Sequence, residues 1–251
     1  MRTIFLLLLL AGLLTSNAQT IGFKAGQLRN QRVSTAYQEK EESLKSLLLS
    51  KGVEISKLNI YIRVFKREKI LEIYGKNKTS KKFQLIREYE ICRNSGVLGP
   101  KRKEGDLQVP EGFYLVNDFN PVSNFYLSLG INYPNESDRI LTDQLHPGGD
   151  IYIHGNCVTI GCMPVTDDKI QEIYLLAVEA KNNGQKEIHV DIFPAKLTNE
   201  ALPGLTKEFP AHASFWENLK LGYDYFEKHK TIPAVKVDRK GAYIISKTSV
   251  S

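Results

Sequence analysis

A histidine and a cysteine stand eight residues apart in the segment IYIHGNCVTIGCMPV, which spans residues 151–165. A cysteine attacks a carbonyl carbon as its thiolate, and a neighbouring imidazole can take the thiol proton. His154 follows an apolar run typical of a buried strand, and glycines at 155 and 161 let a substrate carbonyl approach the backbone N–H groups. The pattern indicates acyl transfer, with Cys162 as the nucleophile and His154 as the base.

Simpler interpretations of the same residues remain open. A histidine at the end of a strand is more often a hydrogen-bonded structural residue, and a buried cysteine is more often inert packing. A zinc site is a further alternative, although the intervals match no familiar finger spacing. Its ligands would be His154, Cys157, Cys162 and His189. We expect no metal and no other cofactor.

The two halves of this segment resemble a known signature. His154-Gly155 followed by TIGC at 159–162 is similar to the catalytic motif of the L,D-transpeptidase (YkuD) family, and most closely to its YafK-like branch. The resemblance implies that Cys162 is the nucleophile and His154 the base. It also implies that Gly155 orients the imidazole through its backbone carbonyl and that N–H groups near Gly161 and Cys162 bind the oxyanion.

Two departures from the family pattern concern substrate contacts. Ile160 stands where the broader family has a second histidine, and Met163-Pro164 replaces a frequent arginine. Two other stretches extend the resemblance in family order, SGVLGPKRKEGDLQVPEGFY at 95–114 and DFNPVSNFYLSLGINYPN at 118–135. With them, the resemblance covers approximately residues 59–193.

The function implied is that of an exported L,D-transpeptidase. The Cys162 thiolate would attack a peptidoglycan stem-peptide carbonyl next to diaminopimelate and form an acyl-enzyme. A YafK-like hydrolase that releases a wall-attached protein or peptide is the close alternative. A non-catalytic, peptidoglycan-binding envelope protein is the alternative of another class. The planar guanidinium of Arg139 could bind a substrate carboxylate through two hydrogen bonds, or Arg139 could be an ordinary surface arginine.

The first residues of the chain predict export. Arg2 precedes an apolar run at residues 4–10, and small residues at 16–18 fit a signal-peptidase site. We expect a signal peptide at 1–18, a location in the periplasm or cell envelope, and no membrane span after cleavage. A retained membrane anchor is the alternative, but the apolar run is short for a spanning helix.

Export bears on the three cysteines, because thiols outside the cytoplasm tend to be oxidised. Any internal pair leaves one cysteine over. We hypothesise that Cys92 and Cys157 form a disulfide while Cys162 stays free. All three could instead be reduced, or Cys157 and Cys162 could pair.

Length and composition favour one main domain. The 251 residues are 42% hydrophobic and 25% charged, which suffices for one sizeable core with appendages. The net charge of +6 comes from scattered lysines, and its simplest interpretation is a solvated surface. No nucleic-acid motif is present, so we expect no nucleic-acid partner.

The elements that must position the site follow from periodicity. Helical spacing is found at 31–51, at 215–226 and after residues 167–168, where Asp167 or Asp168 could cap the helix; strand patterns are found at 59–65, 70–74, 83–92, 113–116, 151–153 and 187–193. An exposed loop is expected at 95–106, and one near the site at 131–150. The predicted fold is α+β: a helical segment at 19–58, a β-dominated YkuD-like domain at 59–196, and a C-terminal helical extension at 197–251.

Overall fold

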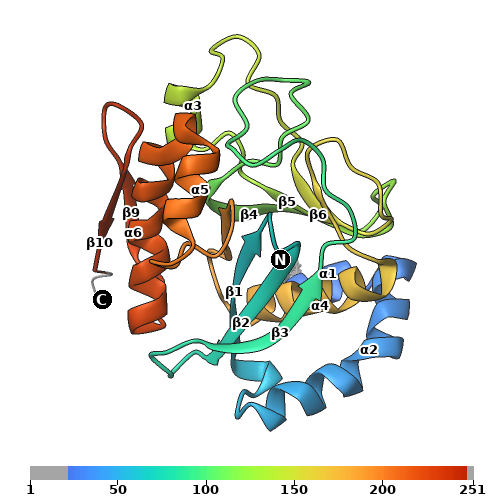
Figure 1. The fold of residues 1–251 in the computed structure, drawn as a ribbon. Helices are drawn as coiled ribbons and strands as arrows, with labels where there is room; N and C mark the ends of the chain where they lie inside the picture. Colours follow the sequence, from blue (N-terminus) through green and yellow to red (C-terminus); the bar gives the residue numbers. More distant parts are fainter. Residues whose placement is uncertain (1–21, 248–251) are drawn as a thin grey trace, which may run out of the picture.

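The computed structural model describes residues 22–247, so the expected signal peptide at 1–18 lies outside the described residues. The centre of the fold is an eight-stranded mixed sheet in the order β3-β2-β1-β8-β4-β5-β6-β7 (Figure 1). Its strands are β1 (Leu58–Phe65), β2 (Ile70–Asn77), β3 (Gln84–Glu90), β4 (Gly112–Asn120), β5 (Ser128–Ile131), β6 (Tyr152–His154), β7 (Met163–Pro164) and β8 (His189–Phe193). The pairs β1–β8 and β6–β7 are parallel, and the others are antiparallel.

Helices cover both faces of the sheet. The helices are α1 (Phe23–Gln27), α2 (Gln31–Ser50), α3 (Glu136–Leu141), α4 (Asp167–Asn182), α5 (Leu202–Glu208) and α6 (Ala213–His229). In Figure 1, α4 and the N-terminal helix α2 lie together on one side, while α5 and α6 lie on the other. A separate two-stranded hairpin, β9 (Ala234–Val237) with β10 (Tyr243–Ser246), flanks α6. The mixed α+β class predicted from the sequence is confirmed.

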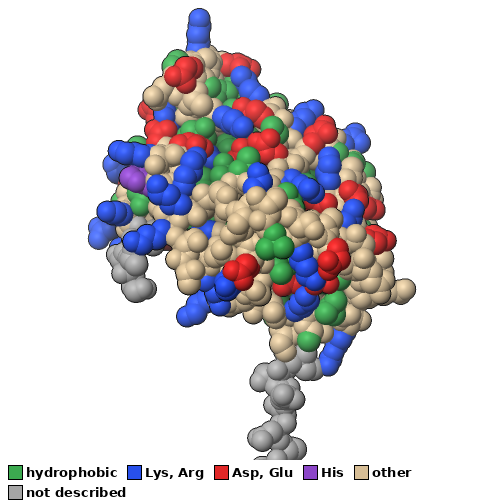
Figure 2. Space-filling model, turned by 90° about the horizontal axis from the view of Figure 1, so that it is seen from below, with side chains coloured by type: hydrophobic (Ala, Val, Ile, Leu, Met, Phe, Trp, Pro, Cys, Tyr) green, Lys and Arg blue, Asp and Glu red, His purple; other side chains and the backbone are tan. Residues whose placement is uncertain are grey.

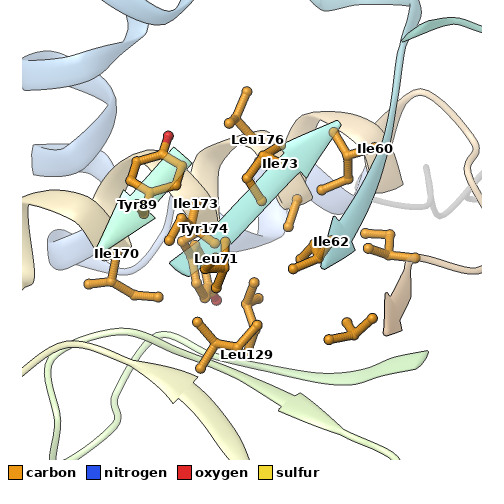
Figure 3. Close-up of a cluster of buried hydrophobic side chains, with 14 of the residues drawn as sticks. Ile60, Ile62, Leu71, Ile73, Tyr89, Leu129, Ile170, Ile173, Tyr174 and Leu176 are labelled. Carbon is orange, nitrogen blue, oxygen red and sulfur yellow. The ribbon is translucent and has the colours of Figure 1, made fainter. Parts of the chain in front are cut away.

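The central strand β1 is buried on both faces, which explains its composition. Its even-numbered side chains, such as Ile60 and Ile62, pack in one core cluster with α4, as Figure 3 shows. Its odd-numbered side chains face α6: the rings of Tyr61 and Phe226 lie 4.7 Å apart. Apolar side chains on both faces of β1 are removed from water, and every residue of the strand except Asn59 is buried.

Helix α4 is more deeply buried than its amphipathic pattern indicated. Every residue from Ile170 to Ala180 is buried, because the sheet covers one side of the helix and α2 packs on another. The prediction that Asp167 or Asp168 caps this helix is wrong: the cap position belongs to Thr166, and its side chain makes no capping bond. Asp167 Oδ1 accepts instead from the N–H of Asn156, in the loop that follows β6.

Helix α6 packs against the sheet at a glycine and contacts a buried ion pair. A Cβ on Gly222 would lie 2.4 Å from Phe113 Cζ, so a glycine inside this helix permits the close approach of the two elements. Nearby, the buried Lys66 Nζ lies 2.8 Å from Glu111 Oε1, and the other Glu111 oxygen accepts from Trp216 Nε1 at 2.7 Å. This network ties α6 to the end of β1 and to the start of β4.

Two segments expected to be loops contain more order than predicted. The prediction of an exposed loop at 95–106 is partly wrong, because Lys101 is buried and its Nζ donates a hydrogen bond to Asp106 Oδ1 at 2.6 Å. The stretch at 131–150 contains α3, which begins with a capping box between Asn135 and Asp138. The hairpin β9–β10 was not foreseen in a tail expected to be helical.

The surface of the described chain mixes charges of both signs. On the face shown in Figure 2, lysine and arginine side chains are spread widely and acidic side chains lie among them. Among residues 22–247, none of the helices combines the length and apolar character that a membrane crossing requires.

Candidate active site

Short strands at the end of the sheet bring His154 and Cys162 to one pocket. β6 ends at His154 and pairs in parallel with β7, where Met163 lies opposite Ile153, so Cys162 directly precedes the strand beside β6. Both side chains line an open pocket of about 220 Å³. The nucleophile and base predicted from the sequence therefore face the same cavity.

The loop between these strands is fixed at several points. Cys157 is joined to Cys92 by a disulfide with a Cα–Cα distance of 5.7 Å, and Cys162 is the free cysteine. Gly161 has φ +142°, which other residues rarely adopt, and a Cβ there would lie 3.2 Å from a backbone oxygen. The space at Gly155 is tighter still, since a Cβ there would lie 2.5 Å from Asp167 Oδ1.

The His154 imidazole is buried and oriented by the backbone. Its Nδ1 lies 2.5 Å from the Gly155 carbonyl oxygen. A carbonyl can only accept, so Nδ1 carries the hydrogen and Nε2 keeps the lone pair that a base needs. The ring also stacks on Phe125, with centroids 4.6 Å apart. Burial lowers the pKa of His154 below its ordinary value, and the bond to Gly155 opposes this shift.

The Cys162 thiol is half-buried beside Tyr152. The N–H of Tyr152 donates to Sγ at 3.4 Å, and Sγ lies 3.5 Å from the carbonyl oxygen of Asp150. Burial raises the pKa of the Cys162 thiol; the Tyr152 N–H opposes the rise and the Asp150 charge adds to it. Burial therefore favours the neutral thiol of Cys162 and the neutral imidazole of His154.

The expected oxyanion donors are occupied in this conformation. The N–H of Cys162 donates to Thr159 Oγ1 at 2.8 Å, and the N–H of Gly161 does so at 3.2 Å. The Thr159 hydroxyl in turn donates to the Cys162 carbonyl at 2.8 Å. These two N–H groups can reach a substrate oxygen only if Thr159 turns away.

Several residues of the pocket were not foreseen from the sequence. They are Asn120, Ser123, Asn124, Phe125, Ser128, Asp150 and Tyr152. Ser128 lies directly opposite His154 across the β5–β6 pair, and Asp150 has φ +54°, a strained conformation just before β6. Such a cross-strand pairing leaves no local signal, and the resemblance at 118–135 assigned no site residue to the β4–β5 segment.

Other candidate residues lie apart from this pocket. Arg139 is exposed on α3 and is not among the residues that line the pocket. Cys157 cannot serve as a zinc ligand while its sulfur is bonded to Cys92. His189, the fourth ligand considered, lies on β8, with Nε2 3.8 Å from Glu187. Among residues 22–247, no three His, Cys, Asp or Glu side chains gather as a metal site requires.

Comparison with known proteins finds a family and individual relatives that this chain resembles. The sequence matches the profile of the YkuD family, described as the L,D-transpeptidase catalytic domain, over residues 59–186. It is 39% identical over 190 residues to the YafK protein of Escherichia coli strain K12, covering 75% of this chain and 74% of that relative. YafK of Escherichia coli O157:H7 matches to the same extent.

Two solved structures are more distantly similar to this chain. The helical cell shape determining protein Pgp2 from Campylobacter jejuni is 19% identical, with a TM-score of 0.43 over 72% of this chain and 73% of that chain. Bd1075 of Bdellovibrio bacteriovorus is 20% identical, with a TM-score of 0.40 over 72% of this chain and 77% of that chain.

Proposed function

The chain belongs to the YkuD family of L,D-transpeptidase catalytic domains, and on that basis we propose that it transfers an acyl group of a peptidoglycan stem peptide through a thioester on Cys162. The observation that carries the proposal is the free Cys162 thiol in one pocket with the His154 imidazole. The catalytic unit would be residues 59–196. The preceding helical segment, residues 19–58, and the C-terminal extension, 197–251, would support it.

In the first half-reaction Cys162 Sγ attacks the carbonyl carbon next to diaminopimelate. The thiol proton passes to His154 Nε2 as the S–C bond forms, and then to the leaving amine as the amide C–N bond breaks. The Tyr152 N–H, 3.4 Å from Sγ, supports the sulfur as its negative charge develops. If Thr159 releases them, the N–H groups of Gly161 and Cys162 would bind the oxyanion.

In the second half-reaction an acceptor attacks the thioester. An amine acceptor gives a cross-link or an attached protein, and its proton returns through His154 to the sulfur. Water as acceptor gives hydrolysis, the YafK-like alternative, with release of a protein or peptide from the wall. The residues named here serve either acceptor.

The decisive assay uses purified muropeptides and product identification by mass spectrometry. We expect new cross-linked dimers if the acceptor is an amine, and released acceptor without new amide bonds if it is water. Cys162→Ala and His154→Gln should abolish either product, while His146→Gln, at an exposed histidine, should not. If Cys162→Ala keeps full product formation, Cys162 is not the nucleophile and the proposed mechanism fails. If wild type forms neither product, a non-catalytic binding role in the envelope is favoured.

Export is part of the proposal. The Met1–Ala18 segment has the character of a signal peptide, and a disulfide such as Cys92–Cys157 is typical of an oxidising compartment. We therefore propose the periplasm or cell envelope as the location. Fractionation of cells that produce the full chain tests this, and recovery of an uncleaved protein in the cytoplasm would contradict it.

A further inference from the structure

Helix α2 lies outside the residues that match the family, yet one of its side chains reaches a wall of the active-site pocket. Arg32 Nη1 donates to the carbonyl oxygens of Ser123 and Tyr126, each at 2.6 Å. The guanidinium also lies 5.8 Å from the centroid of the Tyr126 ring. Hydrogen bonds from a charged donor are shorter and stronger than those between neutral groups, so these contacts hold the backbone at both ends of a four-residue segment.

The segment held by Arg32, residues 123–126, covers the catalytic histidine. Phe125 lies inside it, lines the pocket and stacks on the His154 ring at an interplanar angle of 29°. Tyr126 has φ +72°, which is strained for a residue with a side chain. Strained backbone persists only where its surroundings hold it, and Arg32 binds the carbonyl of that same residue.

Arg32 is itself firmly placed. Asn30 caps α2, because its side chain accepts from the N–H of Arg32 at 2.9 Å. In the same helix, Val33 and Ala36 are fully buried against the main core. Tyr37 adds a 2.9 Å hydrogen bond from its hydroxyl to Glu179 of α4. Helix α2 therefore fixes the position of the guanidinium, and the guanidinium in turn fixes the 123–126 segment.

We propose that Arg32 is a positioning residue of the active site, which holds the 123–126 segment so that Phe125 fixes the His154 ring and shields it from water. Helix α2 is then part of the catalytic machinery and not merely a brace. This inference rests on the proposed function for its kinetic consequence, but the contact between Phe125 and His154 can be tested without any substrate. Asp150 and the titratable Cys162 thiol line the same pocket as the imidazole, and Asp167 Oδ1 approaches Gly155 from the start of α4; the substitutions of Arg32 and Arg29 leave all three unchanged.

The test compares Arg32→Gln with Arg29→Gln in the full-length chain. Arg29 is an exposed arginine three residues earlier, so the control removes the same charge from the same part of the molecule. The first readout is the NMR titration of the His154 ring, assigned with His154→Gln. The second is the rate at which a carbapenem acylates Cys162, followed by intact mass.

Loss of the Arg32 contacts should hydrate the imidazole, so the pKa of His154 should rise towards its ordinary value in Arg32→Gln only. The acylation rate should fall about tenfold, a moderate loss for a misplaced catalytic group. Arg32→Lys, which keeps a donor, should restore part of both effects. In a Phe125→Ala background, Arg32→Gln should have no further effect on the titration.

Each contrary result has a distinct meaning. If wild-type protein forms no adduct, the proposed function fails while the His154 titration still tests the role of Arg32. If wild type reacts and Arg32→Gln leaves the titration unmoved, the inference is overturned, whatever happens to the rate. An equal shift in Arg29→Gln, or an undiminished shift in the Phe125→Ala background, also overturns it.

Discussion

Removal of the Cys92–Cys157 disulfide should weaken both the fold and the loop that carries the active site. The bridge closes a loop of 65 residues. On the chain-entropy relation, a crosslink of that span restricts the unfolded chain by about 4 kcal/mol. For a protein of this size, that loss corresponds to a fall in melting temperature of roughly 10 °C. The variant that tests this is Cys92→Ala/Cys157→Ala, which leaves no unpaired thiol from the bridge.

Urea unfolding followed by circular dichroism provides the measurement, with Cys162→Ala as the control that removes a cysteine but keeps the bridge. A reductant should bring wild type down to the stability of the double variant and should leave the double variant unchanged. Since Cys157 lies between His154 and Cys162, acylation should slow as well. A double variant with wild-type free energy of unfolding would refute this reasoning, as would a double variant that a reductant destabilises further.

Three further experiments test separate parts of the structure. Gly222→Ala should destabilise the protein by about 1–3 kcal/mol through overpacking against Phe113. Gly204→Ala, in an α5 position where a Cβ meets nothing within 4 Å, should instead stabilise it by up to about 1 kcal/mol; thermal melts that rank the two the other way would contradict this. Glu111→Ala should lower the free energy of unfolding by about 3–5 kcal/mol, because it leaves Lys66 buried without its partner. Glu208→Ala removes the exposed partner of Arg67 and should lower it by less than about 1 kcal/mol in the same urea assay. Alkylation of Cys162 by iodoacetamide in the free enzyme should rise with pH through a midpoint above the ordinary thiol range, because burial raises its pKa; a reactive plateau near neutral pH would show a preformed ion pair instead.

The parts of the fold that could be predicted are those with local patterns. The helix over 31–51 is confirmed as α2, and β1 follows the alternation read at 59–65. Short elements escaped because their strand character depends on a neighbouring strand: β7 has only two residues and is a strand only because β6 lies beside it. The deep burial of α4 was missed for the same reason, since a sequence pattern does not show how many partners a helix will have.

In the candidate site, too, the residues within one short segment could be predicted, and the residues from distant segments could not. His154 and Cys162 lie in one short segment, so their proximity could be inferred from strand and turn signals. Phe125 reaches the imidazole from a different part of the sheet, and Arg32 acts on that segment from 91 positions away in the chain. The hydroxyl of Thr159 could be recognised as part of the motif, but its occupation of two N–H groups depends on the turn that the loop adopts.

Peptide mapping after reaction with a carbapenem tests the central claim most directly. The account predicts one covalent adduct per chain, located on the peptide that contains Cys162 and absent from Cys162→Ala. Unmodified protein after prolonged reaction, or an adduct carried by any other residue, would contradict it.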